Sequence, residues 1–333
     1  MCYTSIHILF KAVHNLYKIF IDGQAGTTGL RIGQRLAARN DIELLTLPEA
    51  LRKDPEARRE ALHAAHAAFL CLPDDGARES VALAEGSDCV VIDASTAHRT
   101  APGWAYGFPE LGPALREAIQ TRQRISVPGC HASGFVALAR PLVQAGLLPR
   151  DAPLACLSLT GYTGGGKAKI AEYESPARAK NDALAAPTQY ALGQSHKHLP
   201  EMALHAGLQN PPIFCPVIAD YPCGMEVTIP LHGASRFAVL DCYREFYADA
   251  AMVRVAEPTG EPRPANCMHG RDSMEITVEG RDGRLLLIAR FDNLGKGASG
   301  AAVQCLNLAL GLPETEGLVL KGRHSCRPHR NAP

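Results

Sequence analysis

The sequence Tyr17-Lys-Ile-Phe-Ile-Asp22, with the turn Gly23-Gln-Ala-Gly26-Thr-Thr-Gly29 that follows it, is the stretch that decides the fold. The apolar run predicts a buried strand, and residues 30–39 have the apolar spacing of a helix. Strand, glycine-rich turn and helix in this order are a variant of the dinucleotide-binding fingerprint, spaced G-x-x-G-x-x-G. Glycines let the backbone approach a pyrophosphate, whose charge the helix N-terminus stabilises. The alternative is a glycine turn without a ligand.

Strands and helices continue to alternate after this unit. Residues 42–47, 64–72 and 89–93 have the apolar runs of buried strands, and residues 77–84 have the pattern of a helix. This alternation predicts a parallel sheet, in which ligands bind at the carboxyl ends of the strands. Residues 73–76 and 94–99 follow two of these strands and are therefore candidate site loops.

The second strand ends in Leu45-Thr46-Leu47-Pro48, without an acidic residue. In an NAD-binding fold an Asp or Glu commonly stands at this end and holds the ribose 2′-hydroxyl. Without that acid a 2′-phosphate would not be repelled, and Arg52 and Lys53 could meet it. The pattern favours NADP, and the alternative is that Arg52 and Lys53 belong to a solvated helix face.

The sequence Ile125-Ser-Val-Pro-Gly-Cys130-His-Ala-Ser-Gly134 predicts a strand, a sharp turn and a cysteine at a helix N-terminus. Free N–H groups and the helix dipole at such a position favour the thiolate, which is the nucleophilic form. The alternative is a buried structural cysteine, although the small residues around Cys130 leave more space than a core cysteine needs. Pro141 lies inside the expected helix and should kink or split it.

The pattern changes after residue 151. Residues 156–160 alternate like a strand and run into Gly161-Tyr-Thr-Gly-Gly-Gly-Lys167, which is either an anion-binding loop or a flexible one. Residues 168–195 hold few apolar side chains and are expected to cross the surface. Five later runs resemble strands and predict a mostly antiparallel sheet: residues 213–218, 226–231, 237–243, 274–278 and 285–291. A helix is expected from the Asp292–Ala302 stretch to about residue 310.

A nucleophilic cysteine needs a group that takes and returns protons. The best candidates lie between Tyr190 and Glu201, where His196 and His198 stand close to a carboxylate that can orient an imidazole. The H-x-H pair with nearby His205 could also bind a metal, but no third ligand stands at a recognisable spacing, and we expect none. A solvated polar loop is the other alternative.

Composition excludes several classes of protein. The 333 residues suggest about two domains, and 34 basic residues balance 34 acidic ones, so no overall basic charge indicates nucleic acid. Eleven cysteines without a C-x-x-C pair suit a reducing compartment, and no apolar run is long enough for a membrane span. We interpret residues 1–16 as an extension without the features of a signal peptide, and expect disorder in the tail from residue 323.

Five motifs in order resemble one family, N-acetyl-γ-glutamyl-phosphate reductase in its shorter form. They are the G-x-x-G-T-T-G-L turn, the D-A-S-T-A-H-R loop, P-G-C before a helix, H-K-H-x-P-E, and D-N-L-G-K-G-A-S-G. The resemblance implies a cytoplasmic, NADP-dependent oxidoreductase of arginine biosynthesis. It would interconvert N-acetyl-glutamyl 5-phosphate and N-acetyl-glutamate 5-semialdehyde plus phosphate through a cysteine thioester, with no nucleic acid or membrane partner. It also implies a homodimer or homotetramer.

The resemblance implies a Rossmann-type parallel-sheet NADP domain and an α+β substrate and dimerisation domain. The first would be discontinuous, residues 17–129 plus 293–320, the second would span 130–292, and 321–333 would form a tail. Cys130 would be the nucleophile and His196 the acid/base group, with His198, Glu201 and Tyr190 nearby. Arg99 and Lys167 are substrate-binding candidates. The cofactor-binding candidates are Gly23, Gly26, Thr27, Thr28, Gly29, Thr46, Pro73, Ser95, Asn293 and Gly295.

Three other functions compete with this one. A relative of aspartate-semialdehyde dehydrogenase would use the same cofactor and thioester on a shorter substrate. A cysteine hydrolase would use Cys130 and His196 without a cofactor, against which the glycine-rich turn argues. A non-catalytic dinucleotide sensor would not need both Cys130 and His196.

Overall fold

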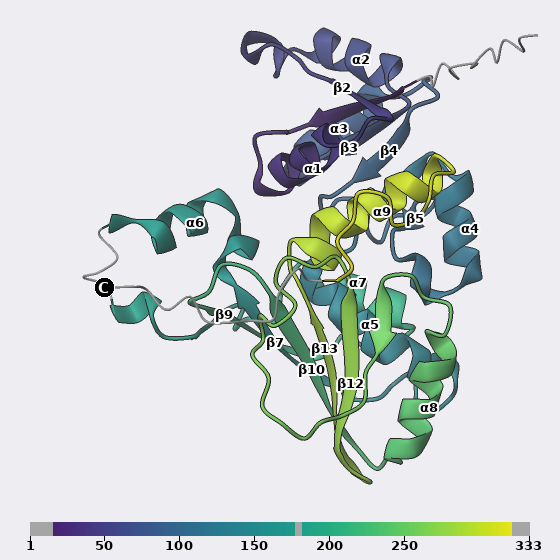
Figure 1. The fold of residues 1–333 in the computed structure, drawn as a ribbon, viewed down its shortest axis with the longest axis vertical. Helices are drawn as coiled ribbons and strands as arrows, with labels where there is room; N and C mark the ends of the chain where they lie inside the picture. The colour runs from purple at the N-terminus through teal and green to yellow at the C-terminus, as the bar shows by residue number, and fades with distance from the viewer. Residues whose placement is uncertain (1–15, 177–181, 322–333) are drawn as a thin grey trace, which may run out of the picture.

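The computed structural model describes residues 16–176 and 182–321, so the extension before residue 16 and the tail after residue 321 lie outside the described residues. Two sheets organise the chain, one above the other in Figure 1. The expected fold class is confirmed: a parallel α/β sheet comes first, and a larger, mostly antiparallel sheet follows.

The first sheet has six parallel strands in the order β2-β1-β3-β4-β6-β5. Its strands are β1 (Tyr17–Asp22), β2 (Ile42–Leu45), β3 (Ala67–Leu70), β4 (Val90–Asp93), β5 (Ala105–Tyr106) and β6 (Arg124–Ser126). Its helices are α1 (Thr27–Ala37), η1 (Glu49–Leu51), α2 (Pro55–Ala64), α3 (Asp74–Leu83), η2 (Pro109–Leu111) and α4 (Pro113–Thr121).

Both faces of this sheet are covered because successive strand residues point to opposite sides. In β1, Ile19 and Ile21 belong to a core shared with α1, whereas Phe20 belongs to a separate core shared with α2 and α3. All three side chains are buried. The sheet therefore carries helices on both sides, and its strand ends remain as the place for a ligand.

The second sheet has seven strands in the order β11-β12-β13-β10-β7-β9-β8. Its strands are β7 (Ala155–Gly161), β8 (Thr188–Gln189), β9 (Ile213–Ala219), β10 (Met225–His232), β11 (Val253–Val255), β12 (Met274–Arg281) and β13 (Arg284–Phe291). Its helices are α5 (Cys130–Gln144), η3 (Tyr162–Gly165), α6 (Gly166–Glu174), η5 (Asp182–Leu184), α7 (Leu199–Ala206) and α8 (Arg236–Phe246). Among the described strands of this sheet, only the pairs β7–β9 and β11–β12 are parallel.

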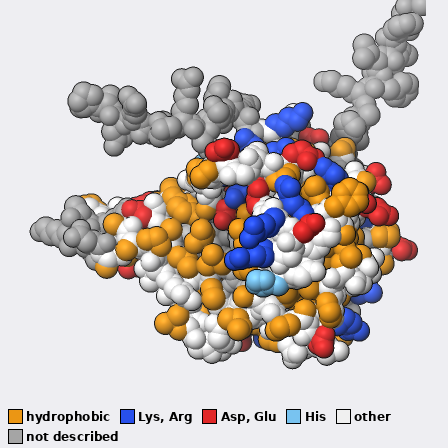
Figure 2. All heavy atoms as spheres, turned by 90° about the horizontal axis from the view of Figure 1, so that it is seen from below, with side chains coloured by type: hydrophobic (Ala, Val, Ile, Leu, Met, Phe, Trp, Pro, Cys, Tyr) orange, Lys and Arg blue, Asp and Glu red, His pale blue; other side chains and the backbone are white. Residues whose placement is uncertain are grey.

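Helices cover one face of the second sheet; the other face, called the open face below, is only partly exposed, because Glu275, Thr277 and Arg290 on it are buried. Buried residues of α5, α7 and α8 share one core with β10, β12 and β13. On the open face the side chains of Leu157, Ile213 and Leu286 are exposed, Ile213 by 64%. Figure 2 shows hydrophobic side chains gathered on the underside of the molecule, on the side where β7 and β9 lie in Figure 1.

A π-helical turn, η6 (Gly295–Ser299), and helix α9 (Gly300–Ala309) return the chain from the second sheet to the first. Buried residues of α9 share the core of β1, β3 and β4, and the helix lies between the two sheets in Figure 1. The ammonium of Lys296 donates to both carboxylate oxygens of Glu110 at 2.7 Å and to Gln304 at 2.6 Å. This fully buried ion pair holds η6 against η2, which follows strand β5 of the first sheet.

Several local predictions were wrong. Residues 237–243 form part of helix α8 rather than a strand, because Val239, Leu240 and Tyr243 lie on one helical face and are buried. Helix α5 is not split at Pro141, which lies inside it. The expectation that residues 168–195 cross the surface agrees with the described residues, most of which are exposed or half-buried, and the segment also contains most of α6 and the short strand β8. The predicted strand over 64–72 shortens to β3, because residues up to Ala64 complete α2.

Candidate active site

A cavity of about 610 Å³ lies between the two sheets and is lined from both. Elements distant in sequence meet there: the glycine-rich turn, the start of α5, the loop before α6, the segment before α7, and η6. The cavity collects eight of the 17 candidate residues, namely Thr27, Thr28, Arg99, Cys130, Tyr190, His196, His198 and Asn293.

Cys130 is the first residue of α5, and Gly129 precedes it with an extended backbone. A Cβ on Gly129 would overlap the guanidinium of Arg99 and the ring of His198, so this close approach requires glycine. Burial raises the pKa of the Cys130 thiol above its ordinary value, although Arg99 and the backbone N–H groups of His131 and Cys130 lower it. The N–H groups at the helix start thus lower the pKa of the thiol by less than the loss of water around the sulfur raises it.

Glu201 holds the turn before the cysteine. Its buried carboxylate accepts the N–H of Gly129 at 2.8 Å, the hydroxyl of Tyr106 at 2.9 Å and Nη1 of Arg99 at 3.2 Å. Arg99 also donates to the carbonyls of Val127 at 2.9 Å and Ala94 at 3.1 Å. Glu201 therefore lies under the Cys130 turn rather than on the cavity, and the guanidinium of Arg99 is largely held by the protein itself.

His131 is a site residue that the sequence reasoning missed. Its ring is buried, with Nδ1 2.7 Å from the Ser158 hydroxyl and Nε2 2.7 Å from the Tyr190 hydroxyl. Burial, with a smaller effect of His196, lowers the pKa of His131 to about 3, so the ring is neutral at pH 7. Burial also raises the pKa of Tyr190, whose hydroxyl keeps its proton and can donate to His131. His131 thus positions Tyr190.

His196 and His198 both line the cavity, with ring centres 4.7 Å apart. Nδ1 of His196 accepts the backbone N–H of His198 at 3.2 Å, which leaves Nε2 of the half-buried His196 for a ligand. His198 is buried, and its Nδ1 has no hydrogen-bond partner among the described residues. Burial lowers the pKa of both rings, and Arg99 adds to the effect.

The segment that carries these histidines has an unusual backbone. Ala191 and Gln194 adopt positive φ angles of 54° and 52°, a region that non-glycine residues seldom enter. The side-chain amide of Gln194 holds this conformation by pairing with both backbone groups of Phe214 on β9, each at 2.8 Å. Such local strain is often found at ligand sites.

The glycine-rich turn has the shape that a dinucleotide needs. Gly23 has a φ of 83°, and a Cβ there would overlap the carbonyl of Cys71. Helix α1 begins at Thr27 without a side-chain cap, so its first N–H groups can receive an anion. Gly26, Thr27 and Thr28 line a hollow of about 290 Å³ beside the turn. A Cβ on Gly29 would lie 2.7 Å from the Gly23 carbonyl, so this glycine closes the turn.

A second hollow, of about 330 Å³, lies between the ends of β1 and β2. Thr46, Arg52 and Lys53 line it, together with Gly23. Arg52 also forms an exposed ion pair with Glu49 at 2.5 Å. The hollow continues from the glycine-rich turn and has two basic side chains where an adenosine ribose would lie in this type of fold.

The loops after β3 and β4 are tied to each other. The hydroxyl of Thr96 donates to Asp74 at 2.6 Å, and the hydroxyl of Ser95 donates to the buried Asp93 at 2.8 Å. Ser95 is buried, while its neighbour Ala94 lines the cavity. Pro73 precedes α3 as its N-cap residue. The candidates Ser95 and Pro73 therefore shape the loops beside the cavity.

The remaining candidates are divided between the cavity and its surroundings. Asn293 lines the cavity, and its amide donates to Thr163 at 3.2 Å and accepts the N–H of Gly224 at 2.8 Å. Gly295 lies against the carbonyl of Arg271, whereas Gly297 and Ala298 line the cavity. Lys167 faces the small hollow at the glycine-rich turn, while Lys169 and Lys197 line the main cavity. The spacing in the sequence could not show that Lys169, and not Lys167, lines the main cavity.

Family models match both parts of the chain. Residues 31–121 match the model described as semialdehyde dehydrogenase, NAD binding domain. Residues 130–293 match the semialdehyde dehydrogenase dimerisation domain.

Curated relatives match almost the whole chain. N-acetyl-gamma-glutamyl-phosphate reductase 2 of Nostoc sp. is 44% identical over 91% of this chain and 100% of its own length. The protein of the same name from Pseudomonas putida is 46% identical over 90% of this chain and 98% of its own length. N-acetyl-gamma-glutamyl-phosphate reductase of Brucella ovis is 46% identical over 88% of this chain and 99% of its own.

Solved structures with the same fold are more distant in sequence. Aspartate semialdehyde dehydrogenase II from Vibrio cholerae superposes with a TM-score of 0.69 at 15% identity, covering 89% of this chain and 99% of that one. Aspartate semialdehyde dehydrogenase with NADP from Candida albicans superposes with a TM-score of 0.62 at 16% identity, covering 88% and 98%. At such identities the likeness establishes the fold alone.

Proposed function

Because the chain belongs to the N-acetyl-γ-glutamyl-phosphate reductase family of semialdehyde dehydrogenases, we propose that it reduces N-acetyl-glutamyl 5-phosphate to N-acetyl-glutamate 5-semialdehyde and phosphate. One observation carries the proposal for the site. Cys130 begins a helix on the wall of a cavity that also contains two histidines and reaches the glycine-rich turn. A nucleophile, a proton carrier and a dinucleotide turn therefore meet in one space.

Cys130 is the nucleophile in this proposal. Its thiolate attacks the acyl carbon, the new C–S bond forms, the bond to the phosphate oxygen breaks, and phosphate leaves. The resulting thioester is electrophilic enough to accept a hydride, which a carboxylate is not, so one difficult step becomes two easier ones. The backbone N–H groups at the start of α5 can stabilise the oxyanion that develops in each step. Bound NADPH supplies the hydride.

His196 is the proton carrier. Its ring is half-buried on the cavity wall, and burial with Lys197 and Arg99 nearby lowers its pKa below 6.5, so it is neutral at pH 7 and can accept the Cys130 proton. When the C–S bond breaks and the aldehyde forms, the proton returns to sulfur. His198, packed against Gly129, and Tyr190, held by His131, would position the substrate and the ring of His196.

NADP is the proposed cofactor, because the residues at the nucleotide turn fit its phosphates. The open N-terminus of α1 suits the pyrophosphate, and Arg52 and Lys53 stand where a 2′-phosphate would lie. Thr46 directly follows β2 and has no carboxylate that would repel this group. Arg99, Lys169 and Lys197 are the basic residues of the main cavity and are the candidates for the substrate's carboxylate and phosphate. Lys167 lines the hollow at the glycine-rich turn and is therefore a candidate for binding the cofactor.

Further parts of the proposal concern the whole chain. Residues 17–129 with 293–320 form the cofactor domain, and residues 130–292 form the substrate domain. The open face of the second sheet is the contact of a homodimer or homotetramer, because exposed leucine and isoleucine side chains lie on it. A cytoplasmic location suits a thiol nucleophile among eleven cysteines. No described helix is both long and apolar enough to span a bilayer.

The test is the substitution of Cys130 by serine. Cys130→Ser should lower the rate of NADPH oxidation with N-acetyl-glutamyl 5-phosphate by at least about 10³-fold, because an alcohol at this position stays protonated. Binding of NADPH, followed by its fluorescence, should remain within about twofold of the original protein. Normal turnover in this variant would remove Cys130 from the mechanism. Loss of cofactor binding would mean that the substitution damages more than the nucleophile.

A further inference from the structure

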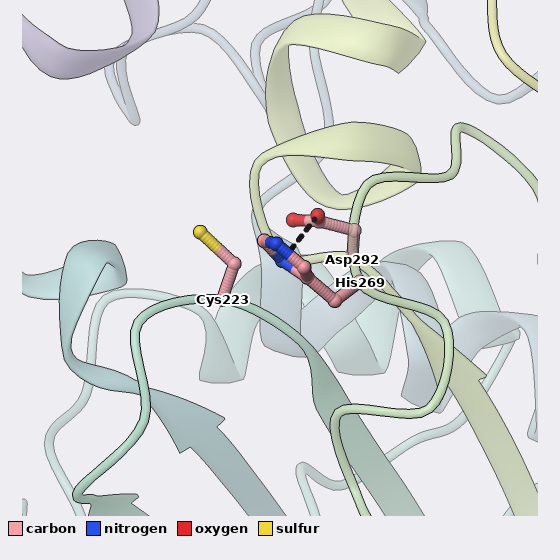
Figure 3. Close-up of side chains that lie close together, drawn as sticks. All are labelled: Cys223, His269 and Asp292. Atoms are coloured by element: carbon pink, nitrogen blue, oxygen red, sulfur yellow. Dashed lines mark ion pairs between the residues drawn. The ribbon is translucent and has the colours of Figure 1, made fainter. Parts of the chain in front are cut away.

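Three side chains outside the active-site cavity form a second cluster, drawn in Figure 3. Cys223 comes from the loop between β9 and β10, His269 from the segment before β12, and Asp292 from the end of β13. One ligand atom of each lies within 4.8 Å of the others. The thiol and carboxylate are buried, while the side chain of His269 is 54% exposed. The cluster is therefore closed on the protein side and open to solvent at the imidazole.

Thiolate, imidazole and carboxylate are the three ligand types that zinc takes in proteins. Tetrahedral zinc with its ordinary bond lengths places ligand atoms about 3.3–3.7 Å apart. His269 Nδ1 and Asp292 Oδ2 are 3.5 Å apart, and the thiol needs to move by no more than about an ångström. Three protein ligands and one open position towards solvent complete the coordination number of zinc.

The carboxylate is held in place before any ligand binds. Oδ2 of Asp292 accepts the N–H of Gly270 at 2.6 Å, and Oδ1 accepts the N–H of Leu294 at 2.8 Å. These hydrogen bonds orient the carboxylate in the way that outer-shell partners orient metal ligands. The hydroxyl of Thr163 donates to the carbonyl of Pro222 at 2.6 Å and lies 3.3 Å from Cys223 Sγ, so it fixes the backbone beside the sulfur.

We propose that Cys223, His269 and Asp292 form a zinc-binding site, separate from the active-site cavity, with a water molecule as the fourth ligand. The motif could not be found by spacing, because the three ligands are separated by 46 and 23 residues (269 − 223 and 292 − 269). The metal that the H-x-H pair suggested would have been elsewhere, at His196 and His198. The site does not depend on the proposed reductase activity.

The charges around the cluster set the conditions for binding. Zinc binds the deprotonated forms of thiol and imidazole ligands, so its apparent affinity rises with pH. Nη1 of Arg31 lies 3.9 Å from Asp292 Oδ2 and opposes a cation. That guanidinium is partly exposed and can turn towards water.

Zinc at this position would join three loops beside the active site. Asn293, which lines the cavity, follows Asp292 directly, and its side chain binds Gly224, the neighbour of Cys223. Thr163 contacts both Cys223 and Asn293 and also lines the cavity. A bound metal would therefore stiffen the cavity wall around Asn293.

Metal binding can be measured without turnover. The starting protein is Cys130→Ser, treated with a chelator and then freed of it, so that the active-site thiol does not contribute. Titration with Co²⁺ should give a thiolate-to-cobalt charge-transfer absorption that saturates at one equivalent. Zn²⁺ should abolish this absorption, and competition with a chromogenic chelator then gives the zinc affinity at pH 7 and pH 8. The affinity should be higher at pH 8.

Matched variants identify the ligands. Adding Cys223→Ser should remove the charge-transfer absorption, whereas adding Cys267→Ser, a cysteine two residues from His269, should leave it unchanged. His269→Ala removes an exposed side chain, so the protein should fold, and zinc affinity should fall by at least about tenfold. The absence of a charge-transfer absorption in Cys130→Ser would overturn the proposal. So would its persistence after Cys223→Ser, or an unchanged zinc affinity in His269→Ala.

Discussion

At the scale of single residues, the thiol of Cys130 is subject to opposing influences. Burial raises its pKa, and the guanidinium of Arg99 with the N–H groups at the start of α5 lowers it. The thiol form therefore predominates at neutral pH in the free protein, and an acceptor for its proton is required. His196 on the same cavity wall is the group proposed to take it.

The pH dependence of Cys130 alkylation tests this balance. Since the pKa is raised above 9.0, the rate of carbamidomethylation of the Cys130 peptide by iodoacetamide should rise between pH 7 and pH 9 without a plateau. Below its pKa the thiolate fraction grows about tenfold per pH unit. Peptide mass spectrometry separates Cys130 from the other cysteines. A plateau at or below pH 8 would show that the thiolate is already the stable form.

The two neighbouring histidines are distinguished by their surroundings. His196→Asn should lower kcat by about 10²–10⁴-fold, the usual contribution of a placed acid/base group. His198→Asn should have a smaller effect on kcat, because the buried His198 ring packs against Gly129. In this account His198 positions the substrate and the His196 ring and does not transfer a proton. Steady-state kinetics of both variants give the comparison. If His198→Asn is the more damaging substitution, the roles must be exchanged.

The sequence indicated the nucleophile but not its full environment. Cys130 and the glycine-rich turn are recognisable because strand, turn and helix follow one another locally. His131 stands next to Cys130, yet its role depends on Ser158 and Tyr190, which only the tertiary fold brings to its two ring nitrogens. Glu201 was expected near the histidines, but its hydrogen bond with the Gly129 N–H, a contact across 72 residues, could not be read from the sequence.

At the scale of secondary-structure elements, helix α7 is joined to the cysteine turn through Glu201. Its carboxylate joins the Gly129 N–H, the Tyr106 hydroxyl and Arg99, all buried. Removal of one partner leaves the other groups without water or protein to pair with. The loop before α5, the end of the first sheet and α7 therefore depend on one carboxylate.

Substitution of Glu201 measures this dependence. Glu201→Ala should lower the free energy of unfolding by about 3–5 kcal/mol, the usual effect of removing one partner of a buried ion pair. Glu201→Gln keeps an acceptor oxygen and should cost clearly less. Urea unfolding followed by circular dichroism gives both values. A Glu201→Ala protein as stable as the original would mean that the Arg99 and Gly129 contacts contribute little.

Elements with strong local signals were predicted and ambiguous ones were not. Five of the six described strands of the first sheet are short apolar runs between turns and were recognised in their order along the chain, whereas the two-residue strand β5 was not predicted. Residues 237–243 were mistaken for a strand because a short run with apolar Phe237, Val239 and Leu240 fits both periods. Its helical face becomes evident only against α5 and β12, which it covers.

At the scale of the whole molecule, two sheets meet at a cavity and one face of the second sheet stays partly exposed. The fold class was predicted from the change in pattern near residue 151, and the return of α9 to the first sheet came only from the family resemblance. Periodicity could not have shown that return, because it depends on contacts such as Lys296 with Glu110, across 186 residues. The open face carries the proposed subunit contact.

Placing a charge on the open face tests the subunit contact. Leu157→Glu should convert the oligomer to smaller species, because an unpaired carboxylate would have to be buried between subunits. Sedimentation velocity gives the mass, and circular dichroism checks the fold. Phe237→Glu, on the exposed surface of α8, is the matched control and should leave the mass unchanged. An unchanged mass for Leu157→Glu would place the contact elsewhere.

The central claim is that this fold acts on the N-acetyl-glutamyl substrate with NADP. Phosphate-dependent reduction of NADP⁺ and of NAD⁺ should therefore be measured with N-acetyl-glutamate 5-semialdehyde and with aspartate semialdehyde, in parallel. We expect kcat/KM to be at least about a hundredfold higher with the N-acetyl-glutamate semialdehyde, since a site shaped for the longer chain leaves polar groups unpaired with the shorter one. We also expect NADP⁺ to be preferred over NAD⁺. Equal or faster turnover of aspartate semialdehyde would contradict the claim.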